Sequence, residues 1–141
     1  MSNIAVVYWS GTGNTEAMAN LIAEGAQEAG AEVKIFQAAD FSEDKVADFD
    51  ALAFGCPSMG DEQLEDSEFE PMFTSVRGAL KGKKVALFGS YGWGDGEWMR
   101  QWQESVEDEG ISLIGDGLIV NDAPDVAGEA ACKELGAKLS R

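Results

Sequence analysis

Two glycine-rich stretches carry the residue types best suited to chemistry. One is Ser10-Gly11-Thr12-Gly13-Asn14-Thr15, which opens a helical pattern, and the other is Tyr91-Gly92-Trp93-Gly94-Asp95-Gly96; each follows an apolar run. Glycines in the first stretch let the backbone turn tightly, so that N–H groups and hydroxyls face an anion at the start of a helix. In the second stretch, an indole between two glycines is free to stack on a planar ring. Together the two stretches predict a site for a phosphorylated aromatic group.

The first stretch contains no lysine or arginine, which limits what a bound phosphate could do there. Enzymes that transfer phosphoryl groups need a lysine or a metal ion to stabilise the developing charge. Position 16 is Glu, so the Gly-x-Gly-x-x-Gly pattern is broken, and residues 78–83 miss the Gly-x-x-x-x-Gly-Lys-Ser/Thr pattern by one residue. We therefore expect the phosphate to anchor a ligand rather than to react. Taken alone, the stretch also fits a polar turn that caps a helix.

A third loop leaves an apolar run at Gly55 and contains Met59 and Gly60. Glycine takes backbone angles that other residues resist, so the peptide joining Gly60 to Asp61 could turn between two orientations at small cost. Met59 offers a polarizable contact to an aromatic plane, although packing in the core explains it equally well. We expect Cys56 to fill space rather than to react, because no basic residue adjoins it in the sequence.

Apolar runs alternate with amphipathic helical patterns, which indicates an α/β fold with a parallel sheet covered on both faces. We expect five strands, at Asn3–Trp9, Glu32–Gln37, Ala51–Gly55, Lys84–Ser90, and an interrupted fifth at Ser112–Ile114 and Leu118–Val120. Helices are expected at Thr15–Ala29, Glu43–Ala47, Glu70–Leu80, Trp98–Glu109 and from about Pro124 onward, with Gly30 and Gly110 as caps and Trp98 and Trp102 in the core. Right-handed crossovers favour the strand order 2-1-3-4-5. The three glycine-bearing loops, with Trp9 and Tyr91, would then share the edge where ligands bind such sheets.

Composition limits the class of protein further. The 141 residues, 45% of them hydrophobic, are expected to form a single domain over residues 1–141. The apolar runs are too short for a membrane span, and no signal segment precedes them, which predicts a cytoplasmic protein. Two cysteines, Cys56 and Cys132, and no histidine argue against a disulfide or a metal site.

The net charge of the chain limits the classes of partner that it could bind. There are 26 acidic and 10 basic residues, a net charge of −16, so nucleic acid and anionic membranes would be repelled and basic proteins are the natural partners. The densest acidic run lies between residues 61 and 70, where six of ten residues are acidic: Asp61, Glu62, Glu65, Asp66, Glu68 and Glu70. Neither the role of this run nor that of Asp95 follows from the sequence.

These loops resemble those of the flavodoxins, of the short-chain type and especially of the clostridial kind. The resemblance covers essentially the whole chain and depends on residues 10–15, 59–62 and 90–94. It implies a flavodoxin-like three-layer sandwich and non-covalently bound FMN. The residues it places at FMN are Ser10, Gly11, Thr12, Gly13, Asn14, Thr15, Ser58, Met59, Gly60, Asp61, Glu62, Ser90, Tyr91, Gly92, Trp93, Gly94 and Asn121.

The resemblance also assigns roles to these residues. Residues 10–15 would hold the FMN phosphate, and Met59 and Trp93 would flank the isoalloxazine ring. The peptide between Gly60 and Asp61 would turn on reduction, so that its carbonyl accepts the flavin N5 proton, and the Glu62 carboxylate would accept from N3. Asn121 would lie near the ribityl chain.

The function that follows is a low-potential one-electron carrier, with no substrate turnover of its own, that shuttles between neutral semiquinone and anionic hydroquinone. It would act as a monomer that meets basic redox proteins and reductases transiently. Nearby carboxylates would oppose the negative charge of the reduced flavin and make it a strong reductant. The alternative is an FMN-dependent NAD(P)H:quinone oxidoreductase, for which the chain offers no extra segment or basic nucleotide pocket. A response-regulator receiver would need an aspartate where Gly55-Cys56 stand.

Overall fold

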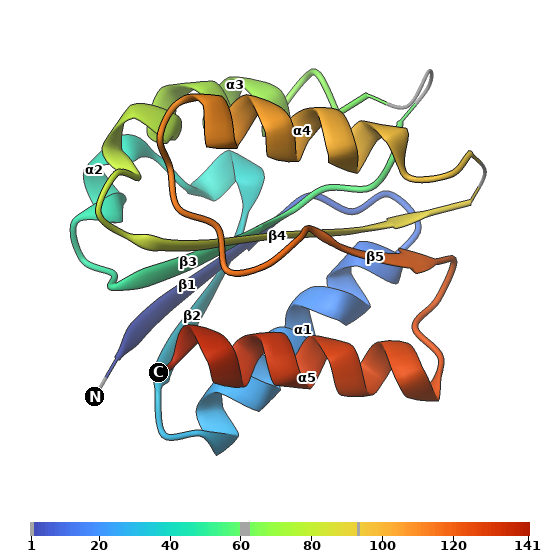
Figure 1. Cartoon of the computed structure of the whole chain (residues 1–141), viewed down its shortest axis with the longest axis horizontal. Helices are drawn as coiled ribbons and strands as arrows, with labels where there is room; N and C mark the ends of the chain where they lie inside the picture. Colours follow the sequence, from blue (N-terminus) through green and yellow to red (C-terminus); the bar gives the residue numbers. More distant parts are fainter. Residues whose placement is uncertain (1, 60–62, 93) are drawn as a thin grey trace.

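The computed structural model describes residues 2–59, 63–92 and 94–141. Its centre is a five-stranded parallel sheet in the predicted order β2-β1-β3-β4-β5 (Figure 1). The strands are β1 (Asn3–Tyr8), β2 (Glu32–Gln37), β3 (Ala51–Gly55), β4 (Lys84–Tyr91) and β5 (Leu118–Asn121). The helices are α1 (Asn14–Glu28), α2 (Glu43–Val46), α3 (Phe69–Val76), α4 (Glu97–Asp108) and α5 (Val126–Leu139). Helices α1 and α5 cover one face of the sheet, and α2, α3 and α4 cover the other.

The alternation of side chains along the strands divides the core into two layers. In β1, Ala5 and Val7 face the layer under α2, α3 and α4, whereas Ile4, Val6 and Tyr8 face the layer under α1 and α5. The central strands β1, β3 and β4 are buried along nearly their whole length, as expected for a sheet that is covered on both faces.

Aromatic rings fill the first layer. Phe69, Phe73 and Trp102 contact one another with ring centroids 5.4 to 6.0 Å apart. Trp98 and Trp102 are 2% and 4% exposed, so the prediction that they belong to the core is confirmed.

The second layer depends on a close crossing of α1 and α5. A Cβ atom added to Gly25 of α1 would lie 2.1 Å from the carbonyl oxygen of Lys133. One added to Gly136 of α5 would lie 2.0 Å from the carbonyl oxygen of Ile22. The two backbones therefore pack directly on each other, which only glycine permits at these two positions. This crossing fixes α1, the first helix after β1.

Most predicted elements are confirmed to within two residues, whereas the fifth strand and the helix predicted at residues 70–80 differ by more. The expected first half of the fifth strand, at residues 112–114, makes only an isolated bridge between Leu113 and Val85, and β5 proper begins after the turn at residues 115–117. Helix α5 begins later than expected, because the Asp125 side chain caps it by accepting from the N–H of Gly128 at 2.8 Å. Pro124 therefore lies before the cap.

Gly30 and Gly110 follow α1 and α4 with φ values of 98° and 81°, as expected for caps. The predicted helix at residues 70–80 is α3 followed by a 3-10 turn at Arg77–Ala79. Among the helices of the described residues, none has the length and apolar character that a membrane span requires.

Candidate functional site

Three loops meet at the carboxyl ends of the parallel strands, the edge where such sheets bind ligands. We call them the β1 loop (residues 10–15), the β3 loop (56–59 and 63–68) and the β4 loop (92 and 94–96). They border two adjoining cavities of about 530 and 240 Å³ that share Trp9, Gly11 and Thr12. The larger is lined by Tyr8, Trp9, Ser10, Gly11, Thr12, Gly13, Glu16, Gln37, Ala38 and Glu68. The smaller is lined by Trp9, Gly11, Thr12, Asn14, Pro57, Ser58, Met59, Ser90, Tyr91, Gly92 and Asp122.

The β1 loop presents the start of α1 to both cavities. Gly13 precedes the helix in the left-handed region, with φ 98°, and its N–H donates to Ser10 Oγ at 3.0 Å. Within the described residues, no side chain caps α1. The N–H groups of its first turn, together with the positive end of the helix dipole, are therefore available to an anion.

Thr15 has a different place from its neighbours in the β1 loop. It is 1% exposed and lines neither cavity, and its Oγ1 accepts from the N–H of Ser90 at 3.3 Å. Thr15 therefore ties the start of α1 to the end of β4, and it is not among the residues that line the two cavities.

The β3 loop brings Ser58 and Met59 to the smaller cavity. The N–H of Ser58 donates to the carbonyl of Ser90 at 3.1 Å, and Met59 and Gln63 exchange two backbone hydrogen bonds of 2.9 and 2.8 Å. Met59 is half-buried rather than in the core, which leaves its side chain available to a ligand. Gly60, Asp61 and Glu62 lie outside the described residues.

Ser58 also has a hydroxyl that could bind a ligand in the smaller cavity. Its Oγ is buried and, within the part of the chain that the structure describes, has no hydrogen-bond partner. An unpaired buried hydroxyl costs about 1–3 kcal/mol, so native proteins seldom keep one without a reason. Because Ser58 lines the smaller cavity, rotation of its hydroxyl toward a ligand there would satisfy it.

Glu65 shows that the acidic run at residues 61–70 is not simply a charged surface. The residue is 6% exposed, and its carboxylate accepts from the backbone N–H groups of Ser67, Glu68 and Phe69 at 2.8 to 2.9 Å and from the Ser67 hydroxyl. Burial raises the pKa of Glu65, but these hydrogen bonds outweigh it and lower the pKa to about 2. The ionised Glu65 therefore caps α3 and holds the end of the β3 loop.

Cys56 supports the same loop. Its Sγ accepts from the N–H of Glu65 at 3.3 Å, and burial raises the pKa of the thiol to about 12. The thiol is therefore protonated at neutral pH, as expected for a cysteine that fills space.

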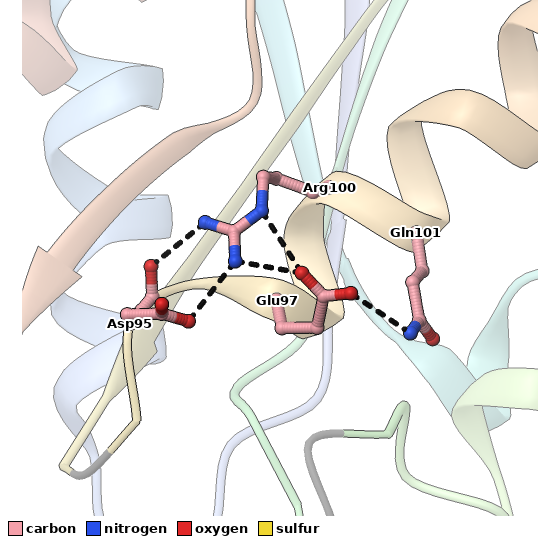
Figure 2. Close-up of polar contacts among 4 residues, drawn as sticks. All are labelled: Asp95, Glu97, Arg100 and Gln101. Atoms are coloured by element: carbon pink, nitrogen blue, oxygen red, sulfur yellow. Dashed lines mark hydrogen bonds and ion pairs between the residues drawn. The ribbon is translucent and has the colours of Figure 1, made fainter.

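The β4 loop is braced by Arg100. The Arg100 guanidinium donates to the carbonyl and carboxylate of Asp95, each at 3.0 Å, and to the Glu97 carboxylate (Figure 2). This bracing is the structural role of Asp95, which the sequence left unassigned. Tyr91 and Gly92 line the smaller cavity, whereas Gly94 is exposed and lines neither. Trp93 lies outside the described residues.

Eight lining residues were not among the predicted ligands: Tyr8, Trp9, Glu16, Gln37, Ala38, Pro57, Glu68 and Asp122. Asp122 has a φ of 57°. Its N–H donates to the carbonyl of Tyr91 at 2.8 Å, and its carbonyl accepts from the Ser90 hydroxyl at 2.6 Å. The predicted Asn121 instead donates to the carbonyl of Tyr91 at 3.3 Å and lines neither cavity. An aspartate shortly before a proline at a strand end favours such a turn, a signal that could have identified Asp122.

Trp9 is another of these unpredicted lining residues. It is half-buried and lines both cavities, and its Nε1 donates to Glu68 at 3.0 Å. The sequence predicted that Trp9 lies at this edge but did not predict that it contacts a ligand.

The site fits a flat ring with a phosphate tail. The smaller cavity is bordered by apolar and aromatic groups from Trp9, Met59 and Tyr91, and the uncapped start of α1 lies beside it. The lining residues of both cavities, as far as the structure describes them, include no lysine or arginine. Amides and hydroxyls would therefore hold the phosphate, and the unpaired Ser58 hydroxyl would gain a partner.

Comparisons with known proteins agree with this geometry. A family model described as Flavodoxin matches residues 6–136. The chain is 56% identical over 133 residues to the flavodoxin of Megasphaera elsdenii, across 94% of this chain and 95% of the relative. It is 50% identical over 135 residues to the flavodoxin of Clostridium beijerinckii, across 96% and 97%. A solution structure of two-electron reduced M. elsdenii flavodoxin aligns with a TM-score of 0.88 at 52% identity, covering 97% of this chain and 98% of that one.

The match extends over nearly the whole chain, and its fold and strand order are those expected from the resemblance. The chain therefore belongs to the flavodoxin family, whose members bind FMN and carry electrons rather than turn over a substrate.

Proposed function

We propose that residues 1–141 form a single FMN-binding domain that carries one electron at a time at low potential, between the neutral semiquinone and the anionic hydroquinone. The observation that carries the proposal is the pair of joined cavities, with the uncapped start of α1 beside aromatic and apolar walls. FMN supplies the redox chemistry when bound, and the residues of the chain position the cofactor and set its electrostatic surroundings.

The β1 loop would hold the phosphate. Ser10, Thr12 and Asn14 supply hydroxyl and amide donors next to the helix N–H groups. Thr15 would act indirectly, because its hydrogen bond to Ser90 positions the loop against β4. An anion held by neutral donors keeps its full negative charge in the site, and this charge disfavours adding electrons nearby.

The β3 and β4 loops would hold the ring. Met59 and Tyr91 border the smaller cavity, and the sequence places Trp93 as the second ring wall. From the sequence we also retain Gly60, Asp61 and Glu62 as the peptide switch and the polar contact, and Gly94 as the glycine that follows the indole. Asp122 adds a carboxylate to the lining, and Asn121 supports the carbonyl of Tyr91.

Charge favours a strong reductant. Carboxylates from Glu16, Glu68 and Asp122 line the cavities, and the whole chain has a net charge of −16. Each like charge near the ring opposes the added negative charge of the reduced flavin. The same charge supports transient binding to basic redox proteins and reductases, with the carrier itself a monomer. The two cysteines, both unpaired and buried, support a cytoplasmic location.

An anaerobic spectroelectrochemical titration of the protein reconstituted with FMN tests the proposal. We expect two separate one-electron steps with a long-lived blue species between them, and no direct oxidation of NADH or NADPH. A single two-electron step, or sustained turnover of a nicotinamide with a quinone, would contradict the carrier function.

Two variants test the ring contacts separately. Gly60→Ala should shift the one-electron potentials, because the substitution restricts the peptide that would turn on reduction. Trp93→Ala should weaken FMN binding by about fivefold, the loss expected for one stacking contact. Unchanged potentials in the first variant, or an unchanged dissociation constant in the second, would remove that residue from the proposal.

A further inference from the structure

The start of α1 carries an acid in a position where it could compete with phosphate. Gly13 is the capping residue, so Glu16 is the third residue of the helix. In the common capping box, a glutamate at this position reaches back to the N–H of the capping residue. A carboxylate there would also interact favourably with the positive end of the helix dipole. Glu16 therefore has a natural conformation that blocks an anion site.

The structure holds Glu16 in a different conformation. Its Oε2 accepts from the hydroxyl of Tyr8 at 2.8 Å, whereas the N–H of Gly13 is bonded to Ser10 Oγ at 3.0 Å. Tyr8 is the last residue of β1 and is 7% exposed, so its ring is fixed in the core between the sheet and α1. Both Tyr8 and Glu16 line the larger cavity beside residues 10–13.

We propose that Tyr8 is a positioning residue for FMN: its hydroxyl holds the Glu16 carboxylate away from the start of α1, so that the helix accepts phosphate instead of its own side chain. This inference rests on the proposed placement of the FMN phosphate at the β1 loop. The pKa of Tyr8 is raised by burial and by its contact with Glu16, which keeps the hydroxyl protonated as a donor. The hydrogen bond between Tyr8 and Glu16 would thus favour phosphate binding without adding a cation.

The contribution of the Tyr8 hydroxyl should appear as a change in FMN affinity that riboflavin affinity does not share. Riboflavin has the same ring and ribityl chain as FMN but lacks the phosphate, so it reports on the ring contacts alone. Without the Tyr8 hydroxyl, Glu16 is free to cap the helix and to repel the phosphate, and only FMN binding should suffer. An anion at a helix start interacts with about 1 kcal/mol, which corresponds to about a fivefold change in affinity.

The test uses Tyr8→Phe, Glu16→Gln and the double variant, with flavin fluorescence to measure the dissociation constants of FMN and riboflavin. Tyr8→Phe should weaken FMN binding by about fivefold and leave riboflavin unchanged. Glu16→Gln should bind FMN at least as tightly as wild type, because it removes the competing charge. The double variant should regain the affinity that Tyr8→Phe loses, and the loss should shrink at high salt.

Three results would overturn the inference, and the third would also overturn the proposed role of the β1 loop. Equal losses for FMN and riboflavin in Tyr8→Phe would mean that the hydroxyl only supports the fold around the flavin. Failure of Glu16→Gln to rescue Tyr8→Phe would mean that the negative charge of the glutamate does not compete with the phosphate. If wild type bound FMN and riboflavin equally well, the phosphate placement itself would be wrong, and with it both the proposed function of the β1 loop and this inference.

Discussion

The β1 loop and the β3 and β4 loops border the same cavities but are held in place by different forces. The β1 loop depends on neutral groups: Ser10 bonds to a backbone N–H, Thr15 bonds to β4, and the helix that follows is fixed by glycine packing. The other two loops depend on ionised side chains, namely Glu65 on the β3 loop and Arg100 beside the β4 loop.

This difference suits the two ends of the cofactor. A phosphate needs a cradle whose geometry does not change with pH or salt, and close backbone packing provides that. A ring that changes its charge and protonation needs surroundings that can adjust. The β4 loop is braced by exposed ion pairs and should adjust more readily than the closely packed helix α1. We therefore expect perturbations of the two regions to differ in size and in their dependence on solution conditions.

The largest effect is expected where α1 crosses α5. In Gly136→Ala, the new methyl group would lie 2.0 Å from the carbonyl oxygen of Ile22, which is backbone and cannot move aside alone. We expect a loss of about 3 kcal/mol or more in the free energy of unfolding, measured with urea on the flavin-free protein. Gly128→Ala in the same helix is the control, because its nearest contacts are side chains at 3.3 to 3.5 Å. Equal effects of the two substitutions would contradict the close-crossing argument.

The next effect should come from Glu65 and should depend on pH. Its pKa in the folded protein is about 2, below the ordinary 4.5, so ionised Glu65 stabilises the fold above about pH 4.5 and loses this effect as pH falls toward 2. Glu65→Gln should cost about 2–3 kcal/mol at pH 7, and the difference from wild type should shrink below pH 4.5. Urea unfolding at several pH values measures both. Asp66→Asn, at an exposed neighbour, should change stability little; a gap between wild type and Glu65→Gln that did not vary with pH would count against the capping role.

These two cases also show how far the sequence can predict the structure. The helix pattern identified α1 and α5, but Gly25 and Gly136 look like ordinary helical residues until the two backbones are brought together. Glu65 lies in a run of acids that looks uniformly exposed, and only the path of the loop turns this one carboxylate onto three N–H groups. Local patterns therefore predicted the elements and the edge where the loops meet. Contacts between distant segments decided which polar residues are buried.

Within the site the same distinction holds. The sequence predicted that Ser10, Ser58 and Tyr91 would gather at one edge, because each follows or ends a strand of the parallel sheet. It did not separate Asn121, which bonds to a neighbouring carbonyl, from Asp122, which lines the cavity. Adjacent residues at a strand end point in different directions, and one residue of register decides which of them meets a ligand.

Ser58 allows a smaller and more specific test, because stability and binding should change in opposite directions. Ser58→Ala removes a buried hydroxyl that has no partner among the described residues, so the flavin-free protein should gain up to about 1 kcal/mol of stability. The same substitution removes a donor from the lining of the smaller cavity, so FMN affinity should fall about fivefold. Unfolding and flavin fluorescence measure the two quantities. A fall in both stability and FMN affinity would show that the Ser58 hydroxyl supports the fold and does not bind the ligand.

The smallest effect is expected at Arg100, where the charged bracing of the β4 loop is exposed to solvent. Arg100→Gln removes the donors to the carbonyl and carboxylate of Asp95 and should loosen the loop without disturbing α4. Because exposed ion pairs contribute at most about 1 kcal/mol, FMN affinity should fall only two- to threefold, to about the limit of measurement. The informative readout is therefore the salt dependence: the wild-type advantage should disappear near 1 M salt, where the Debye length is about 3 Å.

The β1 loop provides the comparison, because a Thr15→Val variant loses a buried neutral hydrogen bond and its deficit in FMN affinity should persist at high salt. If the Arg100→Gln deficit also persisted in 1 M salt, Arg100 would act through packing, and the two regions would not differ in the way that their contacts indicate.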